Sequence, residues 1–390
     1  MKGKPHITKV EVFQFGYEVK DVQREPTIGI SMYKSGGTLP AQGSALRVYT
    51  DEGVTGEYVG GTSTEYAGLS MFVPSIIGRN ALSREEIHTD AKQALKLYAG
   101  MGLSIVDIAL WDLAGKYHNA PIHQLLGGYK ESLPTYVATL HGEEEKTGGL
   151  DAPEAYAYFA EQCLELGYGG FKIHGWENGL VEREIATVHA VGQRVGGSMD
   201  MMLDPFNALQ TLGDAIKVGK ACDEEGFFWY EDPFGDAGTS QFAHRKLRQI
   251  VKTPLLMTEH IRGLEPHVDF MVAEATDFVR GDVMFEGITG VMKVAHAAEG
   301  LGMDIEFHSP GPAQRQCVAA IRNTNYYELS GSHPKVRNQN YVPVYRDDYR
   351  DDLDAADENG HFPVPQGPGL GVEYDWDFIE KHRTALVKYP

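Results

Sequence analysis

The chain has 390 residues, 42% of them hydrophobic, and a formal net charge of −20. This acidity disfavours nucleic acids and anionic membranes as partners, because the protein's field would repel their phosphates. No apolar run approaches the roughly 18–20 residues of a membrane span. The polar N-terminus, MKGKPHITKVEVFQF, lacks the pattern of a signal peptide. The three cysteines, Cys163, Cys222 and Cys317, form no CxxC pair, so we expect a reducing cytoplasm.

Strand patterns dominate the first 60 residues. ITKVEVFQF alternates in polarity, and SALRVYTDEGVTGEY predicts a hairpin that turns at Asp-Glu-Gly. Between them, about residues 20–43 are rich in Gly, Ser, Thr and Pro, which predicts a long loop that is either disordered or a functional lid. Residues 65–128 are predicted to be helical, because apolar residues such as Ile105, Ile108 and Leu113 recur with a helical period.

From about residue 133, short apolar runs alternate with amphipathic segments. The predicted strands are PTYVATL, GGFKIH, MDMMLD, FFWYE, PLLMTE, DFVRGD, GMDIEFH and TNYYELS. Eight strands separated by seven helices predict a βα barrel rather than an open sheet. The tail from about residue 340 ends in DFIEKHRTALVKY, which we expect to be helical and to pack on the first domain.

Three of these strands end in a carboxylate: Asp204, Glu231 and Glu259. The spacings are 27 residues (231 − 204) and 28 residues (259 − 231), the length of one βα unit. Since the carboxyl ends of barrel strands meet at one mouth, the three side chains should lie close together. They would repel one another without a cation. The pattern therefore predicts a site for a hard divalent cation such as Mg²⁺.

Ionisable side chains also follow the other predicted strands. Lys172 and His174 are two residues apart on the second strand, so both should face the barrel mouth. The remaining strand ends carry Asn207, Asp232, His260, Asp282, Glu306, His308 and Glu328. Any one of these is compatible with a structural role, but charges buried at so many strand ends need partners or a metal. Their conjunction favours a catalytic site.

The order of these segments resembles a known family. VDIALWDLAGK, KIH, LDPFNA, WYEDPF, TEHIRG, GDVMFEGITG and IEFHSPG resemble the mandelate racemase subgroup of the enolase superfamily, over roughly residues 5–385. The resemblance implies an α/β fold, a (β/α)₇β TIM-type barrel with an α+β capping domain built from the N-terminal region and the C-terminal tail. We place the capping domain at residues 1–130, the barrel at 131–340 and the returning tail at 341–390. The resemblance also implies that the protein is a homo-oligomer.

The resemblance implies roles for the site residues as well. One Mg²⁺ ion would be held by Asp204, Glu231 and Glu259, and His308, paired with Asp282, would act as general base or acid. Lys172 and a protonated Glu328 would contact the carboxylate of the substrate. Such a site removes a proton next to a carboxylate, and a divalent cation stabilises the resulting enediolate, as is established for enolase-superfamily sites.

His174 stands where the subgroup pattern, KxK, has a second lysine. Three roles are open to it: a second base on the opposite face, a metal ligand, or a contact to a substrate hydroxyl. The leading hypothesis is a dehydratase of a sugar acid that yields a 2-keto-3-deoxy acid. The alternatives are a racemase or epimerase that uses His174 and His308, and a barrel that binds a ligand without turnover.

Polar side chains near the predicted mouth favour a substrate with several hydroxyls. The candidates are Asn207, His260, Arg262, Glu306, Arg280 and Gln314. The 20–40 loop, with Arg24, Tyr33 and Lys34, and the segment Glu57–Tyr66 are expected to close on the distal end of the substrate.

Overall fold

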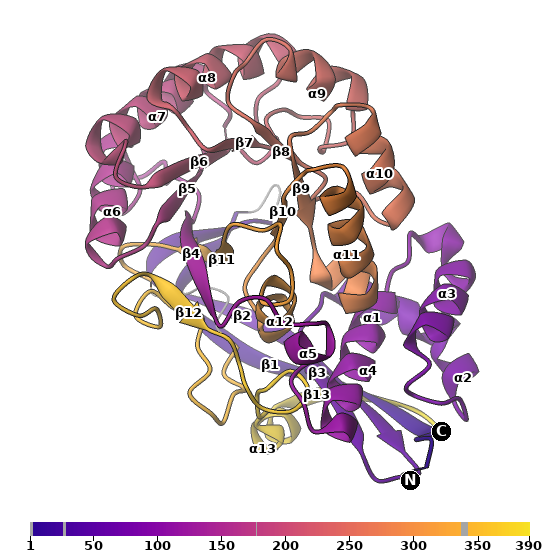
Figure 1. The fold of residues 1–390 in the computed structure, drawn as a ribbon. Helices are drawn as coiled ribbons and strands as arrows, with labels where there is room; N and C mark the ends of the chain where they lie inside the picture. The colour runs from indigo at the N-terminus through magenta and orange to yellow at the C-terminus, as the bar shows by residue number, and fades with distance from the viewer. Residues whose placement is uncertain (1–2, 26–28, 177, 337–341) are drawn as a thin grey trace.

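The computed structural model describes residues 3–25, 29–176, 178–336 and 342–390. It has two parts: a barrel ringed by helices, and an antiparallel sheet with short helices beside it (Figure 1). The predicted fold class is confirmed.

Eight parallel strands form the barrel, in the order β10-β9-β8-β7-β6-β5-β4-β11. They are β4 (Ser132–Thr139), β5 (Gly170–His174), β6 (Asp200–Asp204), β7 (Trp229–Glu231), β8 (Leu255–Met257), β9 (Phe278–Gly281), β10 (Ile305–Phe307) and β11 (Tyr327–Ser332). Seven helices lie between them: α6 (Pro153–Glu165), α7 (Val181–Val195), α8 (Leu212–Glu225), α9 (Gln241–Arg248), α10 (Leu264–Val272), α11 (Val283–Gly300) and α12 (Pro312–Val318). The short β12 (His361–Pro363) pairs antiparallel with β4.

The barrel interior changes from apolar to charged along the strands. A buried cluster that includes Tyr136, Met202 and Trp229 fills one level. Because side chains alternate across a strand, Met202 shares its face with Asp204, and Trp229 shares its face with Glu231. The same inward-facing rows therefore supply apolar packing first and carboxylates at their carboxyl ends.

The second sheet has the order β13-β1-β2-β3 and includes both ends of the chain. Its strands are β1 (Ile7–Arg24), β2 (Ser31–Thr50), β3 (Thr55–Val59) and β13 (Arg383–Tyr389). Six short helices and one longer one accompany it among the described residues before the barrel: α1 (Ser63–Gly68), η1 (Leu69–Met71), α2 (Val73–Ile76), α3 (Arg84–Ala94), η2 (Lys96–Tyr98), α4 (Leu103–His118) and α5 (Ile122–Leu125). The pairing of β1 with β13 confirms that the C-terminal tail joins the capping domain.

Helix α4 joins the two parts. It packs so closely on β3 that a Cβ at Gly56 would lie 2.1 Å from the carbonyl oxygen of Ala109. On its other side, Trp111 Nε1 donates to Thr289 Oγ1 of α11 at 2.8 Å, and the backbone N–H of Thr289 donates to Asp107 at 2.8 Å. Helix α11 begins directly after Asp282, so this junction also fixes one edge of the barrel mouth.

Two predicted elements were wrong. The expected 20–43 loop is largely a long hairpin, in which β1 and β2 pair from Val19 with Leu39 to Arg24 with Ser31; residues 26–28 lie outside the described residues. The expected final helix is α13 (Trp376–Lys381) followed by β13, because Arg383–Tyr389 satisfies its backbone on the edge of β1. In both cases strand pairing overrode local propensity.

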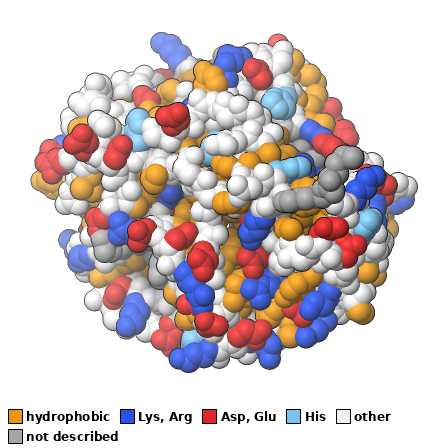
Figure 2. Space-filling model, turned by 60° about the horizontal axis from the view of Figure 1, so that its bottom comes forward, with side chains coloured by type: hydrophobic (Ala, Val, Ile, Leu, Met, Phe, Trp, Pro, Cys, Tyr) orange, Lys and Arg blue, Asp and Glu red, His pale blue; other side chains and the backbone are white. Residues whose placement is uncertain are grey.

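No helix among the described residues is long and apolar enough to span a membrane. On the face in Figure 2, acidic and basic side chains are interspersed rather than gathered in one patch. The three cysteines are buried and free, which fits their spacing in the sequence.

Candidate active site

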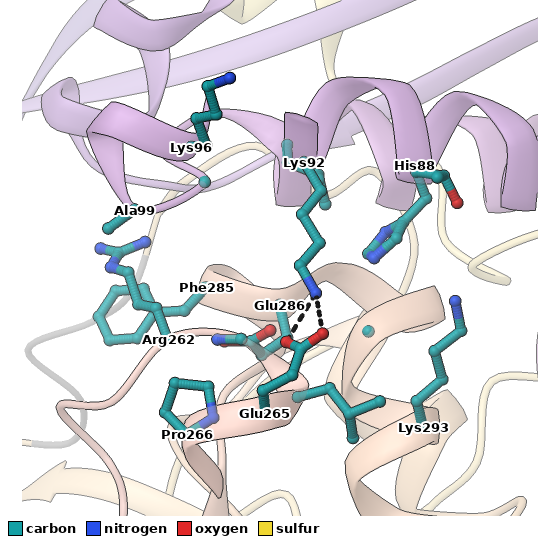
Figure 3. A pocket seen from close by; sticks show the side chains of 16 residues that line it. His88, Lys92, Lys96, Ala99, Arg262, Glu265, Pro266, Phe285, Glu286 and Lys293 are labelled. Carbon is teal, nitrogen blue, oxygen red and sulfur yellow. Dashed lines mark hydrogen bonds and ion pairs between the residues drawn. The ribbon is translucent and has the colours of Figure 1, made fainter. Parts of the chain in front are cut away.

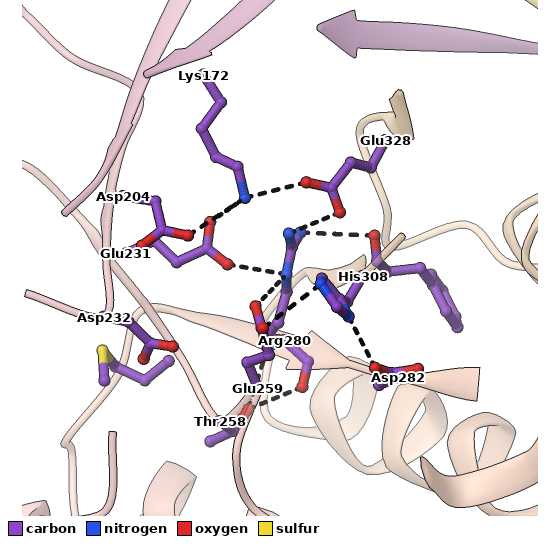
Figure 4. A network of polar contacts seen from close by, with 12 residues as sticks. Lys172, Asp204, Glu231, Asp232, Thr258, Glu259, Arg280, Asp282, His308 and Glu328 are labelled. Atoms are coloured by element: carbon purple, nitrogen blue, oxygen red, sulfur yellow. Dashed lines mark hydrogen bonds and ion pairs between the residues drawn. The ribbon is translucent and has the colours of Figure 1, made fainter. Parts of the chain in front are cut away.

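The three predicted metal ligands converge at the barrel mouth (Figure 4). Asp204 and Glu231 end β6 and β7, and Glu259 follows β8 by two residues. One oxygen from each lies within 4.8 Å of the others. The nearest described ion-pair partner of Glu259 is His308 Nε2 at 3.4 Å, so its oxygens remain available to a ligand. Oxygen donors at this spacing suit a hard cation such as Mg²⁺.

Two buried cations lie among these carboxylates. Lys172 Nζ is 2.8 Å from Glu231 Oε2 and 3.0 Å from Glu328 Oε1. Arg280 bridges the same two residues, with Nε 2.9 Å from Glu231 Oε1 and Nη2 2.9 Å from Glu328 Oε2. Its Nη1 donates to the hydroxyl of Tyr136 at 2.9 Å. Arg280, predicted to contact substrate, is fully buried and instead holds the carboxylates from below.

The charges in the cluster shift its pKa values in opposite directions. Burial raises the pKa of Glu231 to about 8, although Arg280 and Lys172 oppose that shift. Burial also opposes ionisation of Asp204, but His174 and Lys172 outweigh it and hold the pKa of Asp204 below its usual range. A carboxylate whose pKa is raised by burial and like charges is one that a divalent cation can keep ionised.

Glu328 differs from its predicted role as a protonated donor. Burial opposes its ionisation, but Arg280 and Lys172 outweigh burial and hold the pKa of Glu328 well below its usual range. Its carboxylate also accepts the backbone N–H of Ser309 at 2.7 Å. The sequence could not show this, because two of its partners come from other barrel strands.

His308 and Asp282 form the predicted pair, with His308 Nδ1 2.7 Å from Asp282 Oδ2. The other carboxylate oxygen of Asp282 accepts the backbone N–H of Met284 at 2.6 Å and caps α11. With Nδ1 engaged, His308 presents Nε2 toward Glu259. Burial lowers the pKa of His308, but Glu259 and Asp282 outweigh it and raise that pKa to about 10.

His174 lies across the cluster from His308. Its Nδ1 lies 2.5 Å from the carbonyl oxygen of Thr139, so this nitrogen carries the proton. Its Nε2 lies 3.3 Å from Asp204 Oδ2. The structure therefore places the two predicted histidines on opposite sides of the three carboxylates.

Above the cluster lies a cavity of about 290 Å³. Its lining includes His174, Asp204, Glu259, His308 and the hairpin residues 29–31. It adjoins a second cavity of about 330 Å³, since Ser31 and Ser309 line both, and Gln314 lines the second. The pair of cavities is large enough for a small organic acid.

Two further predicted substrate contacts lie away from the carboxylate cluster. Glu306 is fully buried and accepts hydrogen bonds from Asn325 and Tyr326, which precede β11 at the opposite end of the barrel. Arg262 pairs with Glu65 of α1 at 2.9 Å and lines a separate cavity of about 490 Å³ (Figure 3). In that cavity Lys92 is held by Glu265 at 2.7 Å.

Asn207 and His260 stay close to the metal ligands. Asn207 Nδ2 is 3.2 Å from His260 Nε2, which in turn lies 3.0 Å from Asp232 Oδ2. The hydrogen bond to Asp232 raises the pKa of His260 to about 9. Their role as substrate contacts stays a prediction, because neither is among the residues that line the cavity above the cluster.

The hairpin side chains predicted to meet substrate mostly contact the protein. The Tyr33 ring stacks on His333 at 4.4 Å, and His333 Nε2 lies 2.6 Å from Glu143. Lys34 pairs with Glu145 at 3.5 Å on the surface. Arg24 lines the second cavity and donates to the carbonyl of Gly29 at 2.7 Å.

One cavity residue was missed in the sequence. His141 lies just beyond β4, lines the cavity and stacks on His174 with ring centroids 5.2 Å apart. The signal was present, because a histidine follows the first barrel strand, as ionisable residues follow the other seven.

Comparison with known proteins gives the family. Residues 155–378 match the family model "Enolase C-terminal domain-like", and residues 20–127 match "Mandelate racemase / muconate lactonizing enzyme, N-terminal domain". Among solved structures, D-glucarate dehydratase from Agrobacterium tumefaciens, complexed with magnesium, superposes with a TM-score of 0.89 at 28% identity, over 98% of this chain and 100% of that one.

Curated relatives include dehydratases as well as a racemase and a cycloisomerase. D-xylonate dehydratase of Haloferax volcanii is 27% identical over 86% of this chain and 84% of that protein. N-succinyl-L-Arg/Lys racemase of Bacillus cereus is 24% identical over 86% of this chain and 89% of that protein. Since the barrel model alone matches more than half of the chain, the protein belongs to the enolase superfamily and is of the mandelate racemase/muconate lactonizing enzyme type.

Proposed function

We propose that the protein is a Mg²⁺-dependent dehydratase of a sugar acid, an aldonate or an aldarate. The observation that supports this is the His308–Asp282 pair, which directs His308 Nε2 toward Glu259 at 3.4 Å, on one side of the three carboxylates. A carboxylate substrate with its α-carbon beside Nε2 would have its acid group over Asp204, Glu231 and Glu259. Mg²⁺ bound there would neutralise negative charge as it develops on that acid group.

The residues supply the proton transfers. His308 Nε2 takes the α-proton, and the electrons of the broken C–H bond form the enediolate. Asp282 holds the ring so that Nδ1–H points away from the substrate and stabilises the imidazolium that results. His308 then returns its proton to the β-hydroxyl, which leaves as water when the C–O bond breaks. The enol product tautomerises to a 2-keto-3-deoxy acid.

Lys172 and Arg280 contribute positive charge to the site and do not transfer protons. Both are buried and bound to Glu231 and Glu328, and burial is outweighed by those carboxylates so that the pKa of each cation is raised well above its ordinary value. They therefore stay charged and hold the ligands in place. This rigid support is what electrostatic stabilisation of an anionic transition state requires.

A second candidate is a racemase or epimerase. It is favoured by one observation: His174 Nε2 and His308 Nε2 approach the carboxylate cluster from opposite sides, at Asp204 and at Glu259. Two bases on opposite faces are what inversion at a carbon needs. The similarity to N-succinyl-L-Arg/Lys racemase also supports the racemase or epimerase hypothesis.

One experiment separates the candidates. The purified protein with Mg²⁺ is incubated in D₂O with a library of aldonic and aldaric acids, and keto acid is detected with semicarbazide. A dehydratase gives keto acid, whereas a racemase gives α-deuteration with inversion and no keto acid. His308→Asn should abolish either reaction, and unchanged turnover in this variant would contradict the assignment of the base.

A further inference from the structure

His141 is a buried imidazole whose environment suits contact with a ligand. Its residue exposure is 7%, and its ring lines the cavity above the carboxylate cluster. His174 stacks on it at 5.2 Å, and the edge of Phe206 meets it at 4.7 Å. The ring is therefore held on two sides before any substrate arrives.

The protein does not satisfy all of the hydrogen-bonding capacity of the His141 ring. Nδ1 is buried and makes no hydrogen bond of normal distance and angle with the described residues. Burial and the neighbouring His174 lower the pKa of His141 to about 3, against weaker effects of the Asp204 carboxylate and of a hydrogen-bonding contact with the backbone of Gly175, so the imidazole is neutral. A neutral imidazole offers one donor and one acceptor. Unpaired buried polar groups are uncommon and call for an explanation.

Its neighbour His174 cannot supply that explanation. His174 directs Nδ1 to the carbonyl oxygen of Thr139 and Nε2 to Asp204, so both of its nitrogens already have partners beside the carboxylate cluster. His141 stacks on His174, lines the same cavity and has no ion-pair partner among the described carboxylates. Its ring is therefore available to a part of the substrate other than the acid group.

We propose that His141 is a specificity-determining residue that hydrogen-bonds a hydroxyl of the substrate beyond its α-carbon, on the His174 side of the cavity. This rests on the proposed function and names the residue that would recognise one hydroxyl of the sugar acid. An apolar acid would leave the imidazole unpaired in a filled cavity, which costs binding. Phe206, two residues after Asp204 and with a left-handed backbone (φ 53°), packs its ring against that of His141.

The test measures binding, so that it does not depend on turnover. In a His308→Asn background with Mg²⁺, calorimetry gives the Kd of D-gluconate and of its 3-deoxy, 4-deoxy and 5-deoxy analogues. We expect one of these analogues to bind roughly 5- to 150-fold more weakly, the range for one lost buried hydrogen bond. Adding His141→Phe, which keeps the ring stack, should bring that ratio close to one.

Two further variants complete the test. His141→Gln, which can still donate and accept, should restore part of the preference. His244→Phe is the matched control, because His244 is likewise buried and stacked on an aromatic ring, Phe234 at 4.5 Å, but lies on α9. The control should leave the preference unchanged.

The outcomes are distinguishable. If the preference is the same with and without the imidazole of His141, or if no acid is bound with a hydroxyl preference, the proposal is overturned. If the preference depends on His141 but no sugar acid is turned over by the intact protein, the hydroxyl contact stands and the dehydratase assignment falls.

Discussion

Replacing Asp282 with Asn should isolate the contribution of the His308–Asp282 pair to catalysis. Asp282 has two separate tasks: Oδ2 contacts His308 Nδ1 at 2.7 Å, and Oδ1 accepts the backbone N–H of Met284 at the start of α11. Asparagine is as good an N-cap as aspartate, so the helix start should survive. The negative charge beside His308 is lost, and that charge contributes to the raised pKa of the ring.

The expected magnitude follows from these two tasks. General-base catalysis contributes about 10²- to 10⁴-fold, so kcat/KM should fall by that factor, or about 3–5 kcal/mol. Because a base works unprotonated, the lowered pKa of His308 should also move the acid limb of the kcat/KM profile to lower pH. The thermal midpoint should barely change, because asparagine and aspartate are about equally good N-caps.

Steady-state kinetics and thermal melting check both parts. The matched control is Asp375→Asn, because Asp375 caps α13 through Phe378 N at 3.0 Å and lies outside the barrel mouth. It should match the effect of Asp282→Asn on stability and leave kcat/KM intact. A loss of less than tenfold in the Asp282 variant, or a loss explained by unfolding, would refute the role given to the pair.

Three other outcomes are expected. Excess chelator should abolish turnover and Mg²⁺ should raise the thermal midpoint, because the ion binds only the folded cluster; activity in chelator would contradict the metal site. Burial raises the pKa of Glu184 to about 8 from 4.5, so stability present below pH 4.5 is lost as the pH rises toward 8. Glu184→Gln should therefore raise the thermal midpoint relative to wild type more at about pH 8.5 than at about pH 5, and equal shifts at both pH values would argue against that pKa. Tyr33→Leu removes the ring stacked on His333 and should raise KM about 2- to 12-fold with a smaller change in kcat; Lys34→Gln, whose pair with Glu145 is exposed, is the control.

Most of the barrel could be predicted because each of its strands is recognisable from its own local sequence. Each is a short apolar run that ends in a polar residue, and the even spacing of Asp204, Glu231 and Glu259 sets the length of a βα unit. Residues with the same position at the end of a strand must meet at the mouth, whatever the loops do. The convergence of these three carboxylates therefore needed no knowledge of loop conformation.

The errors have a different origin, since they depend on contacts between distant segments. Glu306 and His308 share one face of β10, but one points toward Asn325 at the closed end and the other to the mouth. The alternation of side chains along a strand predicts which face a residue lies on, but it does not predict how deep in the barrel that residue lies. Likewise the hairpin of β1 and β2 could not be told from a loop, because its Gly- and Thr-rich sequence is stabilised by pairing rather than by propensity.

The charge balance of the cluster connects these observations. Four carboxylates, Asp204, Glu231, Glu259 and Glu328, face two permanent cations, Lys172 and Arg280. Two negative charges are left over in a buried space, where unpaired charge is costly. Without a further cation a proton on Glu231 lowers that cost, since burial, with Asp204 and Glu259 nearby, raises the pKa of Glu231 to about 8. A divalent cation removes the imbalance completely. Arg280 was predicted from the sequence to contact sugar hydroxyls. It is instead one of the two cations whose charge, counted against the four carboxylates, makes a divalent metal the matching ion.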